Sequence, residues 1–105
     1  MSRPANPARG ETAIVVAGER LVIRPSFAAL VAAEEELGSL FGLAERAGAG
    51  EMRIAEIAAL FWHCLAEPPE GCTRAAVGEA VASLGLARIA PLLKVLLMQI
   101  LQGRV

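Results

Sequence analysis

Two short apolar runs near the start of the chain constrain the fold more than any other feature. Residues 11–17 read ETAIVVA and residues 21–24 read LVIR, with Gly18, Glu19 and Arg20 between them. β-Branched residues favour strands, and glycine tolerates the backbone geometry of a tight turn. The pattern therefore predicts a β-hairpin with its turn at Gly18-Glu19. Pro25 should end the second strand, because proline has no amide hydrogen to donate.

Helical patterns fill the rest of the chain. Ser26 and Thr73 are good N-caps, and Gly38 and Gly85 suit the position just after a helix. We expect helices over residues 27–37, 40–47, 51–67, 74–84 and 87–102. Pro91 fits the last of these only if it lies within about the first turn. The order predicts an α+β fold, an N-terminal β-hairpin followed by four to five helices packed as a small bundle.

Length and composition indicate one domain with apolar surface to spare. The chain has 105 residues, and 55% of them are hydrophobic. We expect residues 1–9 to form a flexible N-terminal arm and residues 10–105 to form a single α+β domain. A domain this small cannot bury all of its hydrophobic residues. We therefore expect exposed hydrophobic surface that binds a partner or a second subunit.

Charge and hydropathy argue against several classes of partner. The net charge is −1, no basic stripe is present, and three Phe and one Trp are the only aromatic residues. Nucleic-acid binding is therefore not expected. The longest apolar stretch, residues 89–101, is too short to span a membrane and contains Lys94. The first residues lack the apolar core of a signal peptide, so we expect a cytoplasmic protein.

His63, Cys64 and Cys72 are the only cluster that resembles a metal site or a nucleophile with its base. Zinc requires four ligands, usually in closely spaced pairs, and here there are three at most. His63 and Cys64 are neighbours on an expected helix and would point about 100° apart. We therefore expect Cys64 in the core, His63 at the surface or rim, and no metal site.

The run Glu34-Glu35-Glu36 does not indicate acid–base catalysis, because consecutive residues fan around a helix. Glu34 falls on the apolar stripe of its helix, and we expect it to pair with Arg9 or Arg24. The Gly48-Ala49-Gly50 stretch lacks the lysine and hydroxyl residue of a phosphate-binding loop. The sequence thus predicts no catalytic residue, no cofactor, no small-molecule substrate and no enzyme activity.

Some apolar residues are candidates for binding a partner protein. Trp62 lies off the main apolar stripe of its helix, so it is either second-layer core or an exposed anchor. Val95 and Met98 lie on the back of the last helix, which is either central or bound to a partner. A two-stranded hairpin must pack on helices or extend its sheet through another chain. Its apolar residues are therefore candidates too: Ile14, Val16, Leu21 and Ile23.

Three segments together resemble a known family. They are residues 6–11 (NPARGE), residues 24–30 (RPSFAAL) and residues 35–38 (EELG). With the hairpin between them, they are similar to the small tail-assembly proteins of gene transfer agents, a family also seen in phages and prophages. Its members are often described as phage tail tube or gene transfer agent family proteins. The similarity covers most of the chain, although the region of His63 and Cys64 and the linker at residues 68–72 carry no family signature.

The resemblance implies a non-enzymatic role in building a phage-like tail. Family members look like tail assembly chaperones, which keep the tape-measure protein soluble before the tube polymerises. The implied partners are the tape-measure protein or other tail proteins, and self-association is left open. The alternatives are a structural tail tube component within a virion-like particle, or a small helical regulatory module. Tube subunits stack large β-sheets into rings, and this chain offers one hairpin, so we favour the chaperone.

Overall fold

The computed structural model describes residues 11–102, which form a hairpin followed by five helices. The elements are β1 (Thr12–Val16), β2 (Glu19–Ile23), α1 (Phe27–Leu37), α2 (Leu40–Gly48), α3 (Ile54–His63), α4 (Arg74–Leu84) and α5 (Leu86–Gln102). The predicted α+β fold, with an N-terminal hairpin and a helical bundle, is confirmed. The expected arm at residues 1–9 lies outside the described residues.

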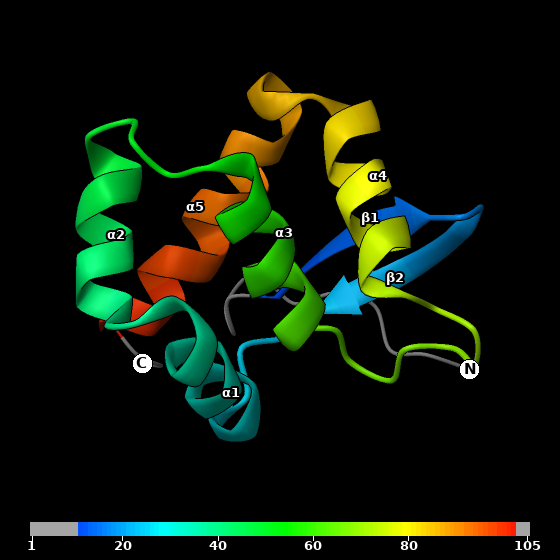
Figure 1. Ribbon diagram of the computed structural model, residues 1–105, viewed down its shortest axis with the longest axis horizontal. Helices are drawn as coiled ribbons and strands as arrows, with labels where there is room; N and C mark the ends of the chain where they lie inside the picture. Colours follow the sequence, from blue (N-terminus) through cyan, green and yellow to red (C-terminus); the bar gives the residue numbers. More distant parts are fainter. Residues whose placement is uncertain (1–10, 103–105) are drawn as a thin grey trace.

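Helix α3 occupies the middle of the molecule, with α2 on one side and α4 on the other (Figure 1). It packs mainly against α4 and α1. The hairpin packs against α4 and α5, which supply the apolar support that two strands alone lack. The core therefore lies between the hairpin and the bundle, and its largest fully buried side chains include Phe61, Leu60 and Leu43.

The hairpin turn lies one residue earlier than predicted. Val16 pairs with Glu19, so the two-residue loop is Ala17-Gly18 and not Gly18-Glu19. Both loop residues have positive φ, 50° at Ala17 and 84° at Gly18. This is the geometry of a type I′ turn, whose twist matches that of the strands on either side.

Helices α1 and α4 have the bounds that their capping residues predict. The Ser26 hydroxyl accepts a hydrogen bond from the Ala29 amide at 3.2 Å, and the Thr73 hydroxyl accepts one from the Ala76 amide at 3.1 Å. Each oxygen satisfies an amide that has no partner inside its helix. Gly38 ends α1 with a φ of 84°, a conformation that glycine adopts without strain.

Helix α3 is shorter at both ends than the predicted range 51–67. It begins after Arg53, whose amide donates to the Glu56 carboxylate at 2.9 Å. It ends at His63 because the following residues pair with the outer edge of β2. The Arg24 amide donates to the Cys64 carbonyl, and the Ala66 amide donates to the Val22 carbonyl.

Helix α5 starts at Leu86, so Pro91 lies inside it and not in its first turn. A proline there removes one hydrogen bond to the carbonyl four residues earlier, that of Ala87. Both Ala87 and Pro91 are exposed, which leaves that carbonyl on the solvent side of the helix.

Helices α4 and α5 meet at Gly85 and bend by 117°. Within residues 11–102, no single helix is long and apolar enough to cross a membrane. Taken together, α4 and α5 have the length and apolar composition of a membrane span, but the bend between them breaks the pair into two shorter helices.

Candidate partner-binding site

An apolar groove with a volume of about 350 Å³ lies between α2 and α5. On α5 it is lined at helical spacing, which places the side chains in one stripe of about three turns. The α5 residues are Ala90, Leu93, Lys94, Leu97, Met98 and Leu101. Met98 is 43% exposed and Leu101 is 50% exposed, so a long apolar surface faces solvent.

The groove is open because the opposite wall consists of small residues. Helix α2 contributes Ala44, Ala47 and Gly48, which lie on one face at i, i+3 and i+4. These residues cannot reach across to cover Met98 and Leu101. The missing side-chain volume leaves space for apolar side chains from another molecule.

Lys94 is the only charged residue in the lining of this groove and the only lysine in the chain. It is exposed, and no ion pair or hydrogen bond engages its ammonium group within residues 11–102. An apolar helix with a carboxylate at its edge would match both the shape and the charge of this surface.

The residues singled out from the sequence fall into three environments. Met98 lines the groove, whereas Val95 is half-buried outside its lining. Trp62 is half-buried and packs against the core, in agreement with the second-layer alternative. The four hairpin residues are in the core and offer a partner little surface: Ile14, Val16, Leu21 and Ile23 are at most 7% exposed. Met98 is the one exposed side chain among these seven candidates.

Sequence reasoning missed most of the groove. Leu93 and Leu97 are nearly buried and still line the groove. The small residues of α2 showed helical spacing at positions 44, 47 and 48. That spacing indicated a helix face of small residues. No pattern of neighbouring residues indicated that α5 would lie opposite this face.

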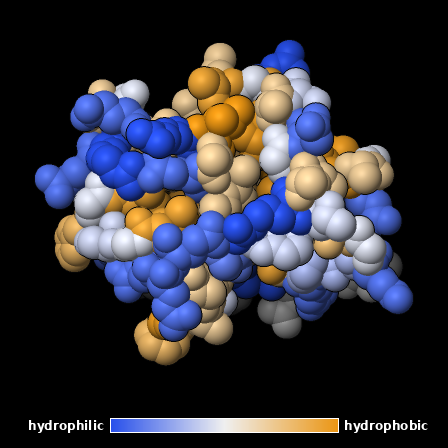
Figure 2. All heavy atoms as spheres, viewed as in Figure 1, coloured by the Kyte–Doolittle hydropathy of each residue, from blue (hydrophilic) through white to orange (hydrophobic). Residues whose placement is uncertain are grey.

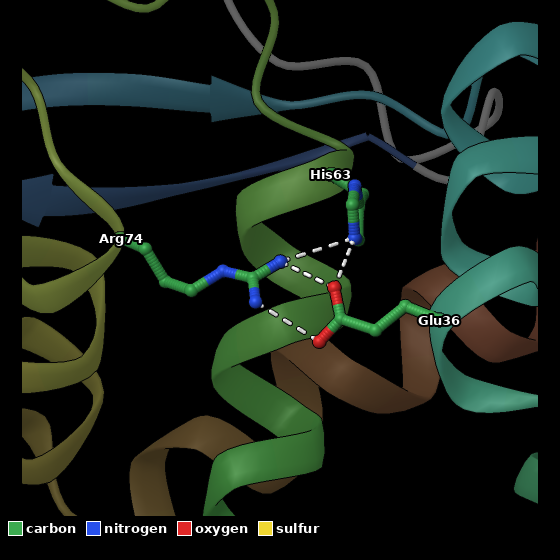
Figure 3. Close-up of polar contacts among 3 residues, drawn as sticks. All are labelled: Glu36, His63 and Arg74. Atoms are coloured by element: carbon green, nitrogen blue, oxygen red, sulfur yellow. Dashed lines mark hydrogen bonds and ion pairs between the residues drawn. The ribbon is translucent and has the colours of Figure 1, made fainter.

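A polar cluster joins three helices at the surface. Glu36 of α1 lies between His63 of α3 and Arg74, the first residue of α4 (Figure 3). The Arg74 guanidinium donates to both Glu36 carboxylate oxygens, at 2.9 and 2.5 Å. The His63 Nε2 atom lies 2.8 Å from the carboxylate and 3.2 Å from the guanidinium. Glu36 is 27 positions from His63 and 38 from Arg74 in the chain, so no local spacing in the sequence revealed these contacts.

The cluster is a charge-paired link between three helices. Hydrogen bonds from Arg74, and then from His63, lower the pKa of Glu36 from 4.5 to about 2. A carboxylate held so firmly ionised is a poor general acid or base near neutral pH. Burial raises the pKa of the nearby Cys64 thiol to about 12, so this cysteine stays protonated and serves as a core residue.

We expect Glu36 to stabilise the fold in a pH-dependent way. Its pKa is lower in the folded chain, so its contribution is complete above about pH 4.5 and is lost as the pH falls towards 2. Glu36→Gln should therefore lower the melting temperature at pH 7 and match the wild type near pH 2. Thermal melts across this range, with the exposed neighbour Glu35→Gln as control, measure the effect. A gap between wild type and Glu36→Gln that is constant with pH would contradict it.

The ion pair expected for Glu34 is not formed with Arg24. Instead, the Arg24 Nε atom donates to the Glu11 carboxylate at 2.6 Å, and Glu11 is only 3% exposed. The Glu34 carboxylate accepts a hydrogen bond from the Leu40 amide at 3.2 Å, at the start of α2. Glu34 therefore fixes the turn between two helices. Arg9, the other expected partner, lies outside the described residues.

Comparison with known proteins gives one result. A family model described as phage tail tube protein, GTA-gp10, matches residues 9–103, which is nearly the whole chain. Neither the curated proteins nor the solved structures contain a significant match.

Proposed function

Since the chain belongs to the family of the phage tail tube protein GTA-gp10, we propose that it is a non-enzymatic tail-assembly chaperone of a gene transfer agent or prophage. In this proposal it acts in the cytoplasm, where it binds the tape-measure protein and keeps that protein soluble until the tube forms. Membership of the family makes it a phage-like tail protein. The chaperone role is the part that we propose.

The observation that carries the proposal is the open groove between α2 and α5. Amphipathic helices bind such grooves through apolar residues at i, i+3, i+4 and i+7. The stripe from Ala90 to Leu101 extends roughly 16 Å along the axis of α5. That length suits about three turns of a partner helix. Lys94 favours a segment that carries a carboxylate beside its apolar face.

The family description favours a second candidate, a structural tube subunit. A tube wall built from stacked β-sheets requires extended sheets, and the described part of this chain has a single two-stranded sheet. Five helices follow that sheet along the chain, and α4 and α5 pack against it. The shape of the molecule therefore supports an assembly factor more than a wall component.

The composition of finished particles distinguishes these two roles. We would purify particles from producing cells and quantify this chain and the major tail subunit by targeted mass spectrometry, in the particles and in the lysate. A chaperone should be abundant in the lysate and fall below one copy per particle. A fixed ratio of this chain to the major tail subunit in finished particles would overturn the proposal.

A further inference from the structure

The two strands of the hairpin differ in what covers their outer edges. Backbone hydrogen bonds join the outer edge of β2 to residues 64–66, including Ala66 amide to Val22 carbonyl at 2.9 Å. Ile23 and Leu65 form an antiparallel bridge there. No backbone group within residues 11–102 bonds to the outer edge of β1. The sheet is thus closed on one side by residues 64–66, and residues 11–102 provide no such cover on the other side.

The register identifies the backbone groups on the uncovered side. Val16 and Glu19 close a two-residue loop, so they form a hydrogen-bonded pair, and pairs alternate from there. Val15 and Ala13 then belong to non-hydrogen-bonded pairs, and their amides and carbonyls point away from β2. The same alternation directs the Val22 carbonyl outward on β2, where it does accept a hydrogen bond.

A wide groove runs beside this edge. It has a volume of about 700 Å³ and lies between β1, α4 and the start of α5. The α4 side presents three small residues at helical spacing, Ala76, Ala80 and Ser83, together with Glu79 and Leu84. Val15 is 62% exposed on the strand side. An exposed edge next to a shallow, small-residue helix face leaves room for another strand.

We propose that β1 pairs antiparallel with β1 of a second copy of this chain, about a two-fold axis close to Ile14. This register places Val15 of each copy opposite Ala13 of the other, a large residue against a small one. Both residues present outward backbone groups, so each Val15–Ala13 pair exchanges two hydrogen bonds. The two hairpins then form one four-stranded sheet.

Charges at the groove favour a second copy as the occupant. Arg20 and Arg88 line it together with Glu79, so both signs are present. A groove lined by charges of one sign would repel the same groove of a second copy. A groove lined by both positive and negative charges allows a self-complementary contact. None of these residues lines the groove between α2 and α5. Self-association at β1 is therefore independent of the proposed chaperone role, and either can fail without the other.

Sedimentation velocity of the full chain over a range of concentrations tests the proposal. We expect a reversible dimer with twice the 11.0 kDa mass of the monomer. Val15→Pro removes an outward amide in each copy and leaves the β1–β2 hydrogen bonds in place. It should raise the dimer dissociation constant about 10- to 100-fold. Val15→Thr keeps the amide and is the matched control, and circular dichroism checks that each variant is folded.

Amide hydrogen exchange of the wild-type chain provides a readout that does not depend on variants. Protection of the Val15 and Ala13 amides should rise with protein concentration as the dimer forms. The proposal is overturned by a chain that stays monomeric, by a dimer that Val15→Pro does not weaken, or by a dimer whose Val15 amide stays unprotected. A strand supplied only by an added tail protein would also overturn it.

Discussion

Phe61→Ala is expected to lower the free energy of unfolding by about 3–5 kcal/mol. Phe61 is fully buried in α3, the helix in the middle of the bundle, and belongs to the main core cluster. Removing the ring takes away buried apolar surface and leaves a cavity that the neighbouring helices can only partly fill. A domain of this size is stable by roughly 5–15 kcal/mol, so the variant should be close to unfolding.

Urea denaturation followed by circular dichroism measures this change, at one fixed protein concentration because self-association would shift the midpoint. Phe27→Ala is the matched control. Its ring is 84% exposed, so its removal should change the free energy of unfolding by about 0.5 kcal/mol or less. A loss below about 1 kcal/mol for Phe61→Ala would show that α3 is not the centre of the core.

The sequence predicted those parts of the fold that depend on neighbouring residues. Ser26 and Thr73 place the starts of α1 and α4, because each hydroxyl bonds to an amide three residues ahead. The β-branched runs on either side of Gly18 predicted the hairpin as well. Its turn was misplaced by one residue, since Ala17 adopts positive φ, a conformation that alanine rarely takes.

Features that depend on distant segments were not predictable. The end of α3 is set by pairing between residues 64–66 and β2, whereas helical spacing alone favoured continuation to residue 67. The contact of Glu36 with Arg74 joins residues 38 positions apart. The α2–α5 groove joins two helices with two others between them in the chain. Only tertiary packing brings these groups together.

Met98→Asp is expected to reduce the amount of tape-measure protein that copurifies with this chain about tenfold or more. The new carboxylate would lie in the apolar groove between α2 and α5, where a docked partner helix would bury it. It would also lie one helical turn from Lys94 and compete with a partner carboxylate for that ammonium group. Met98 is 43% exposed, so the fold itself should tolerate the change.

Leu86→Asp is the matched control for Met98→Asp. Leu86 is also on α5 and is 58% exposed, but it does not line the groove. It belongs to the connection between α4 and α5, over which Figure 2 shows exposed hydrophobic surface near the top of the view. If both variants reduced the copurified tape-measure protein equally, binding would depend on apolar surface in general. That result would contradict a specific role for the groove.

The most direct measurement is the soluble fraction of the tape-measure protein, quantified after coexpression with the wild-type chain, with Met98→Asp or with Leu86→Asp. The tape-measure protein should be soluble and bound with the wild-type chain and with Leu86→Asp. It should precipitate with Met98→Asp and when expressed alone. A tape-measure protein that is equally soluble in all four cases, or that never copurifies with the wild-type chain, would contradict a chaperone acting through this groove.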